Sequence, residues 1–513
     1  MSPYRKIKDS LKLLKRAALL LAALMAFVMV SRSAVPNASA QQQRRGANAA
    51  QSNRVDQSGQ EVMTLLREAV ALLQAGRPES AEPLLRRALA AAPRNPDAHN
   101  LLGAILDQRG RSVDAEREFR EALRLSPGHV SAWSNLGVLL ARTHREAEAI
   151  AAFEAVLKQS PDHPQATFNL GLQYARLGDF ARAASLLERA NTLSPNRFEI
   201  LYNLGAALYQ SKRFDEAVRA LEAASALAPA APEPLYYLGL AASARGQSEA
   251  AVEFWQRAIA LRANFAEANF MIGEELRKNR RADAAREFYE RALAQDSSKL
   301  VHYIRLGGAY MLLNLYGQAL EVFERAARRF PQVAEVHYFA GIAARGSGSY
   351  EVAEAALRKS LALQPDNFDA LAQLGFIVGE RGRLAEAEPL LRRAVALNEK
   401  HFYAHYDLGR LLVRARRYEE AISILQTGAR LRPNHPGVHY QLFMAFSRLK
   451  QKEEATRELA LFQRLEEERK ARRADVEAEN EDAANPPTAA QPVIAEPPSK
   501  RNHPELFFSG PLN

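Results

Sequence analysis

Two pairs of histidines have the spacing of a metal site. His401 and His405 lie four residues apart, and so do His435 and His439, one 34-residue step further along the chain. Residues four apart share one face of a helix, so each pair could supply two nitrogen ligands to Zn²⁺. Each pair also lies at the start of an expected helix, where histidines packed against their neighbours explain the spacing more simply. We therefore predict no metal and no cofactor.

The motifs of catalysis and nucleotide binding are missing. The chain contains no G-x-x-x-x-G-K-[ST] loop, no G-x-G-x-x-G, no H-E-x-x-H and no G-x-S-x-G elbow. It has no cysteine, which excludes disulfides, thiolate metal sites and thiol catalysis. We predict that the chain is not an enzyme. An active site without a recognisable motif is the alternative.

A third group of residues has the chemistry of peptide binding. Asparagine amides can hydrogen-bond a peptide backbone of any sequence, aromatic rings add contact area at low entropic cost, and basic side chains attract carboxylates. All three kinds recur at 34-residue intervals, and we expect the asparagine amides to lie outside the core. The candidates are Asn135, Asn169, Asn203, Phe168, Tyr202, Tyr236, Phe270, Arg142, Arg176 and Lys278.

The 34-residue interval extends through most of the chain. Alanine recurs in one frame from Ala81 to Ala455, and glycine in another from Gly103 to Gly409, without a slip. Twelve units fill residues 62–469. In residues 130–163, the apolar side chains follow the period of two helices separated by a turn, and Pro161 ends the second helix. Neither helix can bury its apolar face alone, so the units must stack.

This pattern closely resembles the tetratricopeptide repeat. The characteristic residues of that family appear in one unit as Trp133, Leu136-Gly137, Ala149, Phe153 and Pro161. The resemblance implies an all-α fold, a right-handed superhelical solenoid of antiparallel helix pairs. It also implies that the candidate residues line a concave face that holds extended peptides, although Tyr and Asn are common at these positions in the family anyway. We expect close helix packing at Gly137, Gly171, Gly205, Ala149, Ala183 and Ala217.

Residues 1–40 have the three-part pattern of a secretory signal peptide. Basic residues at 5–16 precede an apolar run at 17–30, and Ala38-Ser39-Ala40 offers small residues to a signal peptidase. The apolar run is shorter than the ~20 residues that a spanning helix needs. We predict export to the periplasm or the exterior, with a mature chain that begins near Gln41. An uncleaved membrane anchor is the alternative.

Three further segments flank the repeats. Residues 41–61 are predicted to be a disordered leader, residues 470–484 a charged helical extension, and residues 485–513 a proline-rich disordered tail. Leu506, Phe507 and Phe508 form an apolar cluster in this tail, which is either a docking peptide or an inert end.

The positive charge does not indicate a nucleic-acid partner. Residues 1–40 hold seven basic residues against Asp9 alone, a surplus of +6 out of the net +10 of the chain. A nucleic-acid binder would concentrate its charge on the folded part. We predict an extracytoplasmic scaffold that binds proteins or peptides. A carbohydrate-binding component of a polysaccharide export or envelope assembly system is the alternative.

Overall fold

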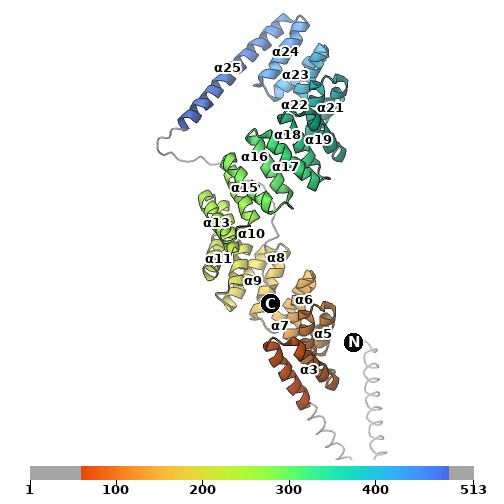
Figure 1. Cartoon of the computed structure of the whole chain (residues 1–513), viewed down its shortest axis with the longest axis vertical. Helices are drawn as coiled ribbons and strands as arrows, with labels where there is room; N and C mark the ends of the chain where they lie inside the picture. The colour runs from red at the N-terminus through yellow and green to blue at the C-terminus, as the bar shows by residue number, and fades with distance from the viewer. Residues whose placement is uncertain (1–58, 484–513) are drawn as a thin grey trace, which may run out of the picture. The chain divides into compact units, whose positions relative to one another are not determined.

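The computed structural model describes residues 59–483, with side chains for residues 59–471. Within this range the regular structure is helical and contains no strand, which confirms the all-α fold. A helix at 59–74 and the helices α3–α25 follow one another in pairs, twenty-four helices in all among the described residues (Figure 1). The predicted signal peptide, most of the predicted leader and the predicted tail lie outside the described residues.

The pairs are uniform in length. Each first helix of a pair from α4 to α24 has 13 residues, and each second helix from α3 to α23 has 14. The first helices are α4 (Pro96–Gln108), α6 (Val130–Arg142), α8 (Pro164–Arg176), α10 (Phe198–Gln210), α12 (Pro232–Ala244), α14 (Ala266–Lys278), α16 (Leu300–Leu312), α18 (Ala334–Gly346), α20 (Phe368–Glu380), α22 (Phe402–Arg414) and α24 (Pro436–Arg448). The second helices are α3 (Pro78–Ala91), α5 (Ser112–Leu125), α7 (Glu146–Gln159), α9 (Phe180–Leu193), α11 (Phe214–Leu227), α13 (Ser248–Leu261), α15 (Ala282–Gln295), α17 (Tyr316–Arg329), α19 (Tyr350–Leu363), α21 (Leu384–Leu397), α23 (Tyr418–Leu431) and α25 (Lys452–Ala483).

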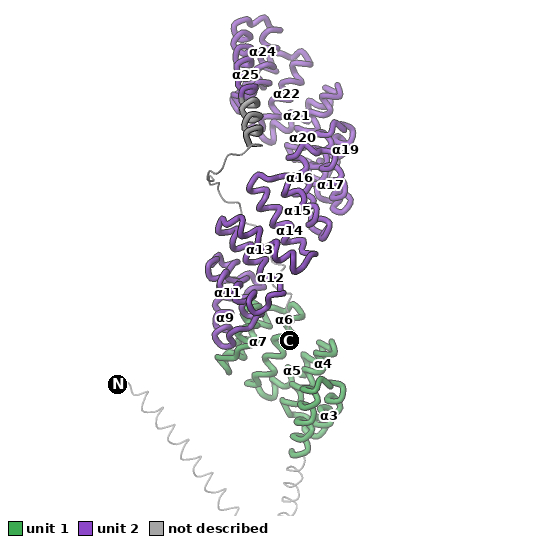
Figure 2. Tube along the Cα trace, turned by 60° about the vertical axis from the view of Figure 1, so that its left-hand side comes forward, with its two compact units in different colours: residues 1–173, 512–513 green, residues 174–511 purple. Residues whose placement is uncertain are grey.

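The chain divides into two compact units (Figure 2). Unit 1 takes in the described residues up to Gln173, and unit 2 begins at Tyr174, so the division falls inside α8. Within each unit, the two helices of a repeat pack together, as α4 does with α5 and α18 with α19. First helices of successive repeats also contact one another, for example α10 with α12 and α20 with α22. We call the surface that the first helices present, away from their second helices, the first-helix face.

One backbone position makes the turn between the helices of every repeat. Its φ is positive in each case, whether the residue is a glycine, such as Gly110 (φ 73°), or a larger residue, such as His144 (φ 57°). Glycine adopts this conformation without steric cost, whereas other residues occupy it less readily. The frame runs at 34-residue steps from Gly76 to Lys450, so the turn geometry is the same whether a glycine or a larger residue occupies the position.

The repeated glycine of each first helix makes room for a large side chain of the second helix. A Cβ atom on Gly137 would lie 2.7 Å from the ring of Phe153, and one on Gly205 would lie 2.5 Å from Leu221. Real Cβ atoms do not approach so closely. The repeated alanines Ala149, Ala183 and Ala217 are fully buried. Small residues at these positions therefore let the two helices of a repeat close on a filled core.

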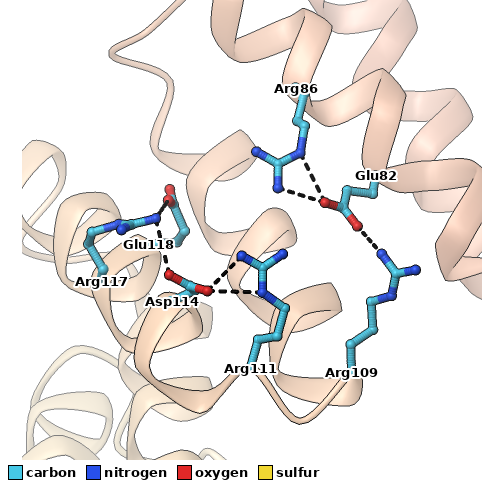
Figure 3. Close-up of polar contacts among 7 residues, drawn as sticks. All are labelled: Glu82, Arg86, Arg109, Arg111, Asp114, Arg117 and Glu118. Atoms are coloured by element: carbon cyan, nitrogen blue, oxygen red, sulfur yellow. Dashed lines mark hydrogen bonds and ion pairs between the residues drawn. The ribbon is translucent and has the colours of Figure 1, made fainter.

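Ion pairs tie some successive repeats together on the second helices. Glu82 of α3 accepts hydrogen bonds from Arg86, four residues on, and from Arg109 at the end of the next first helix (Figure 3). In the next repeat, Arg111 binds Asp114 with N–O distances of 2.7 and 2.9 Å. Three further glutamates in the same 34-residue frame also bind the arginine four residues on, and they bind a second arginine just before the next second helix: Glu116, Glu354 and Glu388.

The last helix is longer than the others. α25 contains 32 residues and continues through the charged sequence after Arg469. Its composition is too polar for a membrane segment, and none of the helices in residues 59–483 combines the length and the apolar character that crossing a membrane requires.

Candidate peptide-binding site

The three predicted asparagines are engaged with the protein itself. The Nδ2 atom of Asn135 donates to Oδ1 of Asn100 at 3.0 Å. Asn169 is 3% exposed and accepts a hydrogen bond from Gln165 at 3.3 Å. Asn203 is 9% exposed and donates to the backbone carbonyl of Glu199 at 2.7 Å.

The expectation that these amides lie outside the core is therefore wrong for Asn169 and Asn203. Neighbouring side chains cover both amides, and a covered amide must find its hydrogen-bond partners within the protein. Asn135 is half-buried. Asn135 and Asn169 belong to unit 1 and Asn203 to unit 2. The role of the three asparagines in peptide binding stays a prediction.

Three of the four predicted aromatic residues are also buried, and the fourth, Phe168, is half-buried. The ring of Tyr202 lies 5.9 Å from the rings of Phe198 and Tyr237. The ring of Tyr236 lies 5.3 Å from that of Phe265, and the ring of Phe270 5.1 Å from that of His302. These rings fill the space between neighbouring helices, so they present little surface to a ligand.

The three predicted basic residues are more accessible. Arg142 is exposed and forms an ion pair with Asp107, on the preceding first helix. Lys278 is exposed and donates to Glu275 at 2.8 Å and to Ser243 at 3.0 Å. Arg176 is partly exposed. Basic side chains thus remain at the surface, where Arg142 and Lys278 are already paired with carboxylates.

The paired histidines take part in helix capping and packing. His401 accepts a hydrogen bond from the backbone of Ala404 at 3.0 Å, as an N-cap residue does. Nε2 of His405 lies 2.8 Å from the carbonyl oxygen of Glu399, six residues earlier. Trp133 makes the equivalent bond to the carbonyl of Pro127 at 2.8 Å. Among the described residues, no three side chains of the metal-binding kinds gather as a possible ion site.

Unit 2 contains a hollow of about 520 Å³ that the first helices α14, α16 and α18 line together with side chains of the second helices α15 and α17. Helix α16 contributes Ile304, Gly308 and Met311, with neighbouring helices on both sides of it. Apolar side chains form most of the lining, and the rings of Phe323 and Phe339 stack within it at 5.3 Å. A volume of this size admits one or two large side chains of a ligand.

Two glycines of α16 explain why the space is there. A Cβ atom on Gly307 would overlap the ring of Phe323, whereas one on Gly308 would have no atom within 4 Å. Gly308 therefore costs helix stability without being required by packing. Other repeats carry a side chain in its frame, for example Leu240 and Ile342. The missing side chain at Gly308 is what leaves the hollow open.

Three arginines are the charged residues of the lining, Arg277, Arg305 and Arg345, and we call the site the arginine-rimmed hollow. Glu274 accepts from Arg305 at 2.8 Å, from Arg277 at 3.2 Å and from Tyr289 at 2.5 Å. Burial alone would raise the pKa of the Glu274 carboxyl, but these hydrogen bonds and the positive charges outweigh it and lower the pKa. Glu274 thus pairs with two of the three guanidiniums, and no carboxylate of the described residues lines the hollow itself, a balance that favours an anionic ligand.

Sequence reasoning did not single out these residues, although a signal was present. Arg305 lies in the 34-residue frame of Asn135, which continues beyond Asn203. Gly307-Gly308 is a doubled glycine inside an expected helix, where only the first belongs to the repeat pattern. An extra glycine within a helix usually has a packing or functional reason.

Comparisons with protein families agree with this architecture. The Tetratricopeptide repeat family matches residues 66–130, 106–164 and 202–264. The chain is a tetratricopeptide repeat protein. Its residues 142–224 also match Anaphase-promoting complex, cyclosome, subunit 3, and residues 260–483 match the C-terminal domain of Cilia and flagella-associated protein 70. Among curated proteins, none matches this repeat protein.

Several solved structures resemble this tetratricopeptide repeat protein at low overall similarity. PilF of Pseudomonas aeruginosa is 20% identical over 42% of this chain and 99% of its own, with a TM-score of 0.38. YrrB, described as a repeat protein with an unusual peptide-binding site, is 23% identical over 37% of this chain and 97% of its own, with a TM-score of 0.32. Cut9 with Hcn1 is 14% identical over 77% of this chain and 92% of its own, with a TM-score of 0.39.

Proposed function

We propose that this tetratricopeptide repeat protein is an exported scaffold that holds peptide segments of partner proteins on its first-helix face. Repeat arrays ordinarily act as extended binding surfaces. The observation that carries the proposal is the arginine-rimmed hollow, which joins an apolar lining to an excess of positive charge. Its ligand is a peptide in which a large apolar side chain stands beside a carboxylate.

The same geometry favours a peptide over a carbohydrate. Sugars stack on flat aromatic rings that are open to solvent, but Tyr202, Tyr236 and Phe270 are buried against neighbouring rings. The hollow instead offers a mainly apolar lining together with three guanidiniums. Guanidiniums form strong paired hydrogen bonds with carboxylates, which peptides supply through acidic side chains.

Selection from a displayed library of random peptides tests the proposal. Peptides enriched on the native chain should carry an acidic residue beside an aromatic residue or a leucine. A chain with Gly308→Leu should lose this enrichment, because the leucine side chain would enter the open space of the hollow. A matched control is Gly317→Leu, since Gly317 likewise has no atom near its Cβ position but does not line the hollow.

Two results would contradict peptide binding at this place. One is the absence of any enriched sequence on the native chain. The other is enrichment that survives Gly308→Leu unchanged. The proposed export is tested separately by determining the N-terminal sequence of the protein from its native cells, which should begin near Gln41 if residues 1–40 are removed.

A further inference from the structure

The tail of this chain contains a segment with the chemistry that the hollow requires. Residues 505–508 read Glu-Leu-Phe-Phe, so one carboxylate is followed directly by three large apolar side chains. No other part of the sequence at 484–513 places three large apolar residues in a row. An apolar cluster of this kind is unusual in a segment otherwise rich in proline and small residues.

The segment and the arginine-rimmed hollow are complementary in apolar surface and in charge. Phe323, Phe339 and Met311 provide apolar surface for leucine or phenylalanine side chains. Glu274 pairs with Arg277 and Arg305, while no carboxylate partner of Arg345 lies within ion-pair distance among the described residues. The guanidinium of Arg345 lies 5.3 Å from the ring of Phe376. Arg345 is therefore placed to receive the carboxylate of Glu505.

The length of the tail allows this contact. Helix α25 packs against α24 and ends at Ala483, and residues 484–504 connect it to Glu505. Such a connection spans up to about 70 Å when extended, at ~3.3 Å per residue. Four repeats separate α24 from α16. At about 10 Å between packed helices, these repeats correspond to roughly 40 Å. The part of α25 beyond Arg469 adds about 20 Å at 1.5 Å per residue, so the extended connection still reaches the hollow from Ala483.

We infer that Glu505–Phe508 binds in the arginine-rimmed hollow of its own chain, and that a partner peptide must displace it. The inference rests on the proposed function, because it assigns a regulator to the same hollow. A short tether presents the attached segment at an effective concentration on the order of 1 mM. Weak intrinsic affinity is therefore enough to keep the hollow occupied until a tighter ligand arrives.

A competition experiment on the full chain tests self-occupation. The tail variant carries Leu506→Ala, Phe507→Ala and Phe508→Ala, and the probe is a labelled peptide with the sequence of residues 498–513. The tail variant should bind the probe about 10-fold or more tightly than the native chain, because the native chain carries a tethered competitor. Adding Gly308→Leu to the tail variant should abolish probe binding, and adding Gly317→Leu should not.

The outcomes separate this inference from the proposed function. Equal probe affinity for the native chain and the tail variant would overturn self-occupation. So would probe binding to the tail variant that Gly308→Leu leaves unchanged. If the library peptides still require Gly308 on both chains, the proposed function stands without the tail. If neither chain enriches any peptide, both the proposed peptide binding and the self-occupation are contradicted. A dimer of the native chain that dissociates in the tail variant would place the segment in a second copy, which also overturns binding within one chain.

Discussion

The side-chain amide of Asn135 on α6 donates a hydrogen bond to the side chain of Asn100 on α4, with 3.0 Å between Nδ2 and Oδ1. Asn100 is buried. The first of the predicted peptide-binding asparagines therefore links two successive first helices of unit 1. A ligand would have to compete with Asn100 for this amide.

Replacing Asn135 with alanine should lower stability. Loss of the amide leaves the buried oxygen of Asn100 without this donor, and an unsatisfied buried polar group costs about 1–3 kcal/mol. Chemical denaturation measures the change, and hydrogen exchange should show it in α4 and α6 before other helices. In a double-mutant cycle with Asn100→Ala, the two losses should be less than additive. Strict additivity would mean that the hydrogen bond contributes nothing.

The neighbouring glycines of α16 should respond in opposite directions to the same substitution. Gly307→Ala places a Cβ against the ring of Phe323 and should cost about 1–3 kcal/mol. Gly308→Ala meets no atom within 4 Å and should stabilise the helix by about 0.5–1 kcal/mol. Denaturant midpoints of the two variants give both values. Changes of the same sign would show that the environments of the two glycines do not differ as described.

Glu354 should be the most sensitive carboxylate of α19. It is buried and binds three arginines, Arg358, Arg381 and Arg383. Glu354→Gln should cost about 1–3 kcal/mol, because it removes the negative charge on which the three guanidiniums converge. Glu351 on the same helix is the matched control, since it is largely exposed and binds Arg381 alone at 2.9 Å. Glu351→Gln should cost less than about 0.5 kcal/mol by the same denaturation assay.

The contribution of Glu354 should also depend on pH. The hydrogen bond from Arg383, with the charges of the neighbouring arginines, holds the pKa of the Glu354 carboxyl below its ordinary value of 4.5. Because the folded pKa lies below the unfolded one, this stabilisation is complete above pH 4.5 and is lost as the pH falls through the folded pKa. The difference in stability between the native chain and Glu354→Gln should shrink in acid. A difference that is constant from pH 7 to pH 3 would contradict this account.

Asp407 should show the reverse dependence. Burial raises the pKa of its carboxyl from 3.8 to about 7, against the opposing charges of Arg410 and Arg345 and with the added repulsion of Glu380. The unfolded chain then loses its proton first, so ionisation destabilises the fold progressively as the pH rises from about 4 to about 7. Asp407→Asn should stabilise the protein more at pH 8 than at pH 4, by on the order of 1 kcal/mol or more. Melting temperatures at the two pH values measure this.

Several features of the fold followed from the sequence because each repeat uses the same local rules. The frame of Gly137 predicted close packing of two helices, and a Cβ there would indeed meet Phe153. The turn frame that contains Gly110 has a positive φ throughout, even at His144. These features depend on contacts within one repeat. The residue types that make such contacts recur at the same positions of successive repeats, so the sequence alone reveals them.

The sequence by itself determined the all-α fold, its pairing of helices and the repeat length, because helix periodicity and a fixed 34-residue interval leave little alternative. It could not determine which side chains of the first helices remain open to a ligand. The asparagine and aromatic frames look alike along the chain, yet Asn169, Tyr202 and Phe270 are buried, and the rings of Tyr202 and Phe270 lie against Tyr237 and His302 of the next first helix. A hollow lies at Gly308, where one repeat lacks a side chain that its neighbours have. Exposure depends on how three consecutive repeats pack, and that is decided by the tertiary structure.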